Sequence, residues 1–182
     1  MTDEASLHLV CRVLQWQDGT YQVAPLIMRP ERQEALQGHL MLLFTGLSRT
    51  AAEIAKTQIE NLSRRASELR ALTQIVDRAI ETLRSQCDLA EFGRLLNEGW
   101  SLKRRLSDRV STPDIDSLYD TALRAGAIGG KLLGAGGGGF LLLFVRPEHR
   151  AKIRAALPKL IDVPFHFDTS GSRIVLYQPD GW

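Results

Sequence analysis

The residues best suited to chemistry lie in a glycine-dense stretch at 126–145, which reads GAIGGKLLGAGGGGFLLLFV. The four consecutive glycines at 136–139 need a reason, because glycine loses much conformational entropy on ordering and adds no side chain to a core. Apolar residues on both sides distinguish the stretch from a polar, flexible linker. It therefore predicts a loop whose backbone N–H groups approach a ligand, most simply an anion, with a tight structural turn as the alternative.

Two familiar nucleotide-binding motifs do not fit this stretch. Gly134, Gly136 and Gly139 have the G-x-G-x-x-G spacing, but that fingerprint needs a strand before it and a helix after it. Here the pattern predicts a helix, then the loop, then a strand. A Walker A loop fails because Leu132 stands where a Ser or Thr is required. Lys131 could add a positive charge to the loop, although an ordinary solvated lysine explains it equally well.

Composition narrows the function classes. The chain has 182 residues and a formal net charge of +2, which is too small to indicate nucleic-acid binding. Its two cysteines, Cys11 and Cys87, match no metal-ligand spacing. No apolar run approaches the roughly 18 residues of a membrane span. We expect one cytoplasmic domain over residues 1–182, with no metal site, no nucleic-acid partner and no membrane contact.

The N-terminal third predicts strands. Residues 6–16 alternate apolar and polar side chains, which is the period of a half-buried strand, and Asp18-Gly19 is a hairpin signal. We expect the returning strand at 21–24, limited by Pro25. A short helix of one or two turns is expected at 29–37, and the apolar run at 40–45 predicts a buried strand.

Helical periodicity dominates the middle of the chain. Apolar residues recur at helical spacing from Ala51 to Leu83, which predicts one long helix with Ser48 or Thr50 as its N-cap. A second such pattern covers 89–106. Thr112 followed by Pro113 is typical of the start of a third helix, expected to end near 125.

The C-terminal part returns to strands. We expect a fully apolar strand at 140–145, followed by a helix that begins at Pro147. After this helix we expect a hairpin of strands at 163–167 and 173–177. The inner face of that helix should carry Ile153, Ala156 and Leu157. This order of elements predicts an α+β fold, an antiparallel sheet with helices packed on it.

The glycine stretch also carries a resemblance. The sequence GKLLGAGGGG at 130–139, followed by an apolar strand, resembles the third, C-terminal motif of the GHMP kinases. Residues 42–51, 100–107 and 111–134 resemble the D-glycero-D-manno-heptose 7-phosphate kinase group within that family. The resemblance implies a ferredoxin-like C-terminal domain with a long helical insertion. It also implies ATP and Mg²⁺ as cofactors of the intact family enzyme.

The resemblance assigns candidate site residues. It places a nucleotide- and substrate-binding loop at Lys131, Gly134, Ala135, Gly136, Gly137, Gly138 and Gly139. Three cations in family-like stretches are candidates for a substrate phosphate, namely Arg49, Lys103 and Arg104, because guanidinium and ammonium groups suit that role. Surface salt bridging is the alternative interpretation of these three residues.

The departures from the family pattern are equally informative. The sequence contains neither the phosphate-gripping P-x-x-x-G-L-x-S-S loop nor the motif that carries the family's catalytic aspartate. We therefore nominate no catalytic residue, and expect the substrate- and nucleotide-cleft domain of an ATP-dependent sugar kinase, a transferase, without its N-terminal ATP-binding half. Such a chain should be incomplete for phosphoryl transfer, which depends on positioning and charge stabilisation.

Its expected partners are a sugar phosphate, ATP or ADP, and either an N-terminal kinase half or a second copy of the chain. Two alternatives remain open. The chain could be a non-catalytic ligand-binding or association module derived from such a kinase, or a structural remnant without a ligand.

Overall fold

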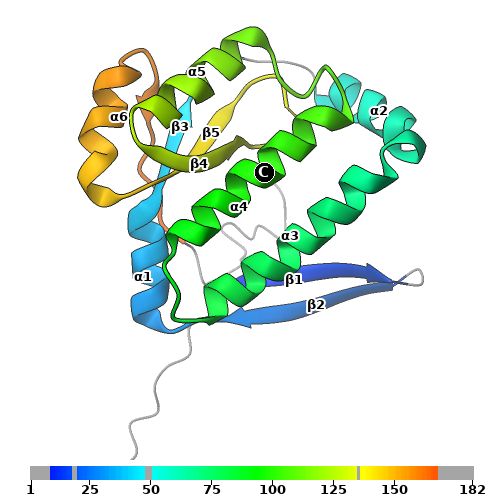
Figure 1. Cartoon of the computed structure of the whole chain (residues 1–182), viewed down its shortest axis with the longest axis horizontal. Coiled ribbons are helices and arrows are strands. Elements are labelled where there is room, and N and C mark those ends of the chain that lie inside the picture. Colours follow the sequence, from blue (N-terminus) through cyan, green and yellow to red (C-terminus); the bar gives the residue numbers. More distant parts are fainter. Residues whose placement is uncertain (1–8, 18–19, 48–50, 135, 168–182) are drawn as a thin grey trace, which may run out of the picture.

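The computed structural model describes residues 9–17, 20–47, 51–134 and 136–167 (Figure 1). The elements follow in the order β1 (Leu9–Gln17), β2 (Thr20–Ile27), α1 (Pro30–His39), β3 (Leu40–Phe44), α2 (Ala51–Asn61), η1 (Leu62–Arg64), α3 (Ala66–Arg84), α4 (Ala90–Leu106), α5 (Pro113–Arg124), β4 (Ala127–Leu132), β5 (Phe140–Val145), η2 (Pro147–His149), α6 (Arg150–Ala156) and β6 (Ile161–Asp162).

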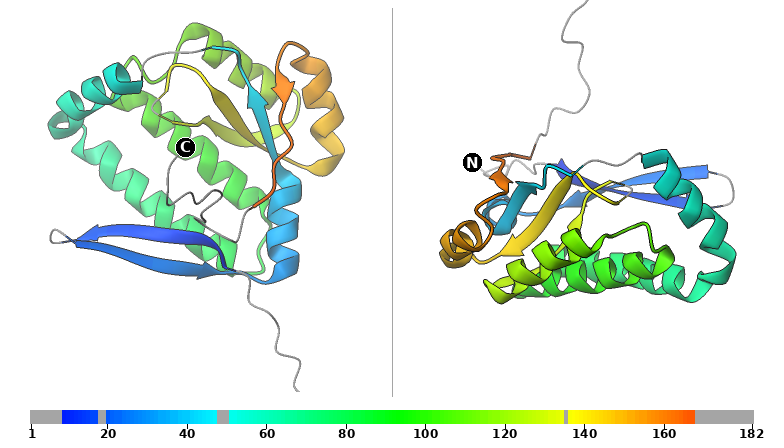
Figure 2. Two further views of the ribbon diagram at one scale, coloured as in Figure 1. Left: turned by 180° about the vertical axis from the view of Figure 1, so that it is seen from behind. Right: turned by 90° about the horizontal axis from the view of Figure 1, so that it is seen from above.

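The expected α+β fold with an antiparallel sheet is confirmed. Four strands form one antiparallel sheet in the order β4-β5-β3-β6, and β1 and β2 form a separate two-stranded sheet. The β1–β2 pair extends away from the larger sheet and runs beside α3 in both face-on views (Figures 1 and 2). Helices α3 and α4 lie side by side in opposite directions.

Two elements in the N-terminal half are longer than expected. β2 continues through Pro25 to Ile27, because a two-stranded sheet leaves each strand one free edge where proline's missing N–H breaks no ladder bond. α1 spans ten residues, longer than the expected one or two turns.

The prediction of a single long helix before α4 is wrong. The segment divides into α2 and α3 around η1 and a non-helical Arg65. Just before η1, the Asn61 side chain donates to Leu106 O at the end of α4 at 3.1 Å. Asn favours helix ends, because its amide competes for backbone partners.

The structure also contains a strand, β4, where we expected loop. Its glycines look like turn residues in the sequence, but Gly129 lies against α4, and a Cβ added there would collide with the carbonyl oxygen of Gly93. Glycine is therefore needed for close helix–strand packing and not for a turn. The order around residues 133–139 is strand, loop, strand. The dinucleotide fingerprint still fails, because β5 follows instead of a helix.

The C-terminal expectations are met in part. Ile153 and Leu157 are buried as expected, whereas Ala156, the last residue of α6, is exposed. Residues 163–167 form no strand. The pairing with β3 is made instead by β6 and ends with a hydrogen bond from Val163 N to Leu42 O, 2.8 Å long. The strand expected at 173–177 lies outside the described residues.

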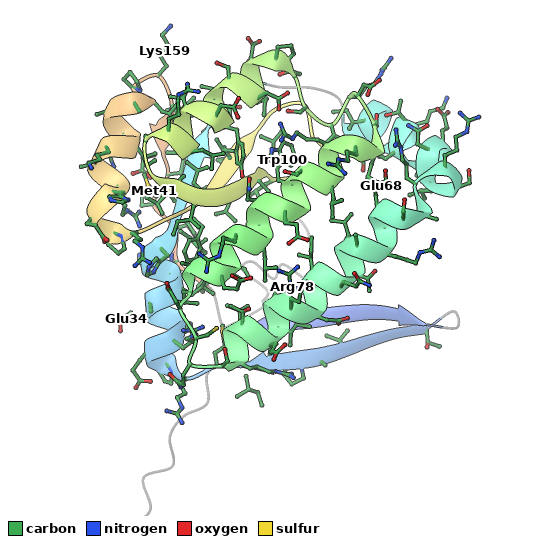
Figure 3. The ribbon with its side chains drawn as sticks, viewed as in Figure 1. Glu34, Met41, Glu68, Arg78, Trp100 and Lys159 are labelled. Atoms are coloured by element: carbon green, nitrogen blue, oxygen red, sulfur yellow. The ribbon has the colours of Figure 1, made fainter. Side chains whose placement is uncertain are left out.

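Two hydrophobic clusters hold these elements together. The larger joins the sheet to α4, α5 and α6, and its bulkiest fully buried members are Trp100, Tyr119, Met41, Leu43, Leu141 and Leu143. The second joins β2, α1 and the end of α3 to Leu40 and Phe144. On the surface, Arg78 of α3 reaches Glu98 at 2.9 Å and Glu91 at 3.4 Å on α4, which ties the two helices together (Figure 3).

Candidate functional site

The glycine loop at 133–139 is fixed by hydrogen bonds to two distant segments. Gly137 N donates to Val110 O at 3.0 Å, and Gly139 N donates to Leu47 O at 2.8 Å. Gly139 O in turn accepts from both the backbone N (2.9 Å) and the side-chain Oγ1 (2.8 Å) of Thr45. The loop is therefore an ordered connection between β4 and β5. Ala135 lies outside the described residues.

Gly136 is required at its position for two reasons. Its φ of 126° lies in a region that L-residues rarely adopt, and an added Cβ would lie 2.5 Å from Val110 O. The expected run of free N–H groups is shorter than the sequence indicated, because Gly137 and Gly139 are already bonded. Within the part of the chain that the structure describes, the N–H groups of Gly134, Gly136 and Gly138 have no acceptor. The loop therefore keeps three unbonded donors within the described residues.

Two lysines flank the loop. The Lys103 ammonium donates to Gly134 O at 2.7 Å. Burial lowers the pKa of Lys103, and the nearby positive charge of Lys131 lowers it further. Neither lysine has a carboxylate within ion-pairing distance among residues 9–17, 20–47, 51–134 and 136–167. The structure therefore brings two of the predicted site residues together with uncompensated charge.

Arg104 lies in a different environment. Its guanidinium pairs with Asp116 at 2.9 Å, and Ser111 Oγ donates to the same carboxylate oxygen at 2.7 Å. The guanidinium carbon also lies 5.8 Å from the centre of the Trp100 ring, within cation–π range. The positive charge of Arg104 is thus already partnered by the protein. Arg49 lies outside the described residues.

Arg104 lines an open pocket of about 680 Å³, together with Arg65, Ser101, Arg105, Ser107, Asp108, Ser111, Thr112, Pro113 and Asp116. These residues come from the start of α3, the end of α4 and the start of α5, where Thr112 caps the helix as predicted, accepting from Ile115 N at 3.2 Å. The resemblance assigned Arg104 to a substrate phosphate but did not predict the convergence of these residues. Sequence periodicity gives no signal for it, because three separate elements must first be placed.

Tyr119 is a further polar residue near the loop that we had not singled out. Its hydroxyl contacts Asn97 Oδ1 at 2.8 Å and Gly130 O at 3.3 Å, so it links α5, α4 and β4. Burial raises the pKa of Tyr119 to about 12. The residue is fully enclosed, at 1% exposure, which makes it a structural link and not a ligand contact.

We expect Tyr119→Phe to lower the free energy of unfolding by about 1 to 2 kcal/mol at pH 7, because Asn97 and Gly130 lose a buried partner. The tyrosine pKa is raised in the folded state, so its contribution is full below about pH 10 and falls as the pH approaches 12. Urea denaturation of both proteins from pH 7 to 11 measures this. A difference that grows with pH would contradict the assignment.

Two other kinds of site are absent from residues 9–17, 20–47, 51–134 and 136–167. Those residues contain no group of three or more His, Cys, Asp or Glu side chains that could hold a metal ion. They also contain no helix long and apolar enough to cross a membrane.

The family assignment comes from comparison with known proteins. The family model for the C-terminal part of GHMP kinases matches residues 79–162. The chain carries a GHMP kinase C-terminal domain. The matched range includes the glycine loop, Lys103, Arg104 and Lys131, so every described candidate belongs to the domain itself.

Relatives with assigned functions are kinases that act on different substrates. The chain is 30% identical over 135 residues to the bifunctional fucokinase/GDP-fucose pyrophosphorylase of Arabidopsis thaliana, covering 72% of this chain and 13% of that protein. It is 30% identical over 139 residues to the D-glycero-alpha-D-manno-heptose 7-phosphate kinase of Campylobacter jejuni, covering 75% and 41%. The chain thus spans less than half the length of either relative.

Solved structures confirm the fold. A mevalonate kinase of L. major in complex with R-mevalonate superposes with a TM-score of 0.68 at 24% identity, over 83% of this chain and 47% of that one. A D-glycero-D-manno-heptose 1-phosphate kinase from Bacteriodes thetaiotaomicron gives 0.52 at 24% identity, over 83% and 40%.

Proposed function

We propose that this GHMP kinase C-terminal domain forms one wall of the cleft of an ATP-dependent kinase that phosphorylates a sugar or sugar phosphate. The observation that carries the proposal is the glycine loop, held by Val110 and Leu47, with Lys103 and Lys131 beside it. Unbonded N–H groups next to uncompensated ammonium groups are suited to phosphate oxygens. The names of the fucokinase and heptose phosphate kinase relatives support the substrate class.

The residues fit the phosphates of ATP better than they fit Mg²⁺. Gly134, Gly136 and Gly138 supply N–H donors, and Lys103 and Lys131 supply charge. The described residues offer no carboxylate cluster for Mg²⁺, so we assign that ion to none of them. ATP would supply the transferred phosphoryl group. This chain's residues would bind and orient phosphate oxygens and would not abstract a proton.

The phosphate of the acceptor is a separate question. We propose Arg104, with Arg49 as a second candidate, for that group, because the Arg104 pocket lies at the end of α4 that also carries Lys103. Binding there requires Arg104 to exchange Asp116 for phosphate, which weakens its affinity compared with a free guanidinium.

The proposal is tested by ATP turnover. We expect no turnover of heptose phosphates or related sugars by the chain alone, because its sequence lacks the phosphate-gripping motif and the catalytic aspartate motif of the family. Addition of an N-terminal GHMP kinase half should restore turnover, and sedimentation should then show a complex. Turnover by the chain alone would disprove the expectation that the chain is incomplete for phosphoryl transfer. Binding without restored turnover would favour a non-catalytic module.

The loop's role has a direct test in Gly136→Val. We expect ADP binding, measured by calorimetry, to weaken at least about tenfold, because valine cannot adopt the loop's backbone angle and its Cβ meets Val110 O. Gly38→Val is the matched control, since an added Cβ there meets nothing within 4 Å. Unchanged ADP affinity in the Gly136→Val variant would show that the loop is not part of the ADP-binding site.

A further inference from the structure

A second cavity lies between α3 and α4, separate from the Arg104 pocket. It has a volume of about 370 Å³, within the usual range for small-molecule sites. Its walls are mainly aliphatic and aromatic, formed by Leu72, Ile75, Val76, Ala79, Leu95, Leu96, Gly99, Trp100 and Leu106, together with Lys103 and Lys131. A cavity of this composition favours an apolar ligand body.

Among the described residues that line this cavity, the only charged side chains are those of the two lysines, and both are positive. Lys103 is half-buried, and its pKa is lowered first by burial and then by Lys131. Two ammonium groups beside an apolar wall and without a carboxylate partner are electrostatically unfavourable. A bound anion would reduce this cost, so the cavity combines an apolar body with a site for a negative head group.

Trp100 adds an independent observation. Its side chain is 1% exposed, and its indole Nε1 has no hydrogen-bond partner in the described part of the chain. The indole N–H can only donate, and a buried donor is normally satisfied. Trp100 forms part of the cavity wall. The Trp100 ring therefore contributes apolar surface to the cavity, and its Nε1 remains a buried donor without a partner in the described part of the chain.

We propose that the α3–α4 cavity binds an amphiphilic anion, with its phosphate or carboxylate at Lys103 and Lys131 and its apolar body between the helices. A sugar would leave its hydroxyl groups unsatisfied against the leucine side chains, which is costly. The site shares the two lysines with the proposed kinase cleft but takes a different class of ligand.

The first test uses hexyl phosphate as the probe in calorimetry, with inorganic phosphate and 1-hexanol as matched single-feature controls. We expect hexyl phosphate to bind at least about tenfold more tightly than either control, because it satisfies both parts of the site. Its affinity should fall as rising pH deprotonates Lys103, whose pKa is lowered. Equal affinity for inorganic phosphate, or for hexanol, would overturn the proposal.

Variants locate the site. Lys103→Met and Lys131→Met should each weaken hexyl phosphate binding, while Lys152→Met on the exposed face of α6 should not. Ala79→Leu fills the cavity wall and should weaken hexyl phosphate binding while leaving inorganic phosphate binding unchanged. Hexyl phosphate binding that tolerates both Ala79→Leu and Lys131→Met would place the ligand elsewhere.

ADP titration of the same proteins separates this inference from the proposed function. Ala79→Leu should leave ADP affinity unchanged, and Gly136→Val should leave hexyl phosphate affinity unchanged. ADP binding without hexyl phosphate binding would overturn the amphiphile site alone. Hexyl phosphate binding without ADP binding would overturn the nucleotide loop alone.

Discussion

Gly129→Ala is expected to lower the free energy of unfolding by about 3 kcal/mol, the upper part of the usual range for overpacking. The added methyl group would overlap the carbonyl oxygen of Gly93, which is backbone and cannot rotate away, and would also approach Asn97 N at 3.0 Å. Helix α4 must therefore move off β4. Urea denaturation monitored by circular dichroism measures the loss.

Gly38→Ala in α1 is the matched control for this substitution. An added Cβ there meets nothing within 4 Å, so alanine should stabilise the helix by about 0.5 to 1 kcal/mol through its higher helix propensity. If Gly129→Ala were as stable as the wild type, the close approach of α4 to β4 would be wrong. The control shows that any loss at 129 comes from the contact and not from glycine replacement in general.

Trp100→Ala is expected to cost about 3 to 5 kcal/mol, the usual range for removing a buried aromatic side chain. Trp100 is 1% exposed, belongs to the larger core cluster, and lies 6.3 Å from the ring centre of Tyr119. Its removal leaves a large void between α4 and α5. Loss of the ring also removes the cation–π partner of Arg104.

Trp100→Phe separates the contribution of the apolar ring volume from that of the indole N–H group. It should cost much less than Trp100→Ala, since most of the apolar volume is kept and the unpartnered Nε1 takes no hydrogen bond with it. Val76→Ala, at a position that is 49% exposed, serves as the control for general truncation and should lie within about 1 kcal/mol of the wild type. A small effect of Trp100→Ala would show that α4 packs differently.

The pattern of apolar residues predicted the elements that carry either a regularly spaced apolar face or an unbroken apolar run. β3, α4, α5 and β5 were expected within one or two residues of their bounds, because burial on one face leaves a repeating apolar pattern. β4 was missed because two of its six residues are glycines, whose role depends on the helix that crosses them. The α2–α3 break was missed because Asn61 bonds Leu106, a partner 45 residues away.

The candidate site shows the same limit. The resemblance indicated the glycine loop, but only the fold shows that the N–H groups of Gly137 and Gly139 already donate hydrogen bonds to Val110 O and Leu47 O. Lys103 and Arg104 are neighbours in the sequence and were assigned one role. Successive helix residues point about 100° apart, so Lys103 reaches Gly134 while Arg104 reaches Asp116.

The hydrogen bonds donated by Gly137 and Gly139 connect the loop to two segments that are far apart in the chain. Val110 lies in the connection between α4 and α5, and Leu47 follows β3. A displacement of the loop therefore cannot stay local, because it must break these bonds or carry both connections with it. The positions of three chain segments are therefore linked, namely the loop, the connection between α4 and α5, and the residues that follow β3.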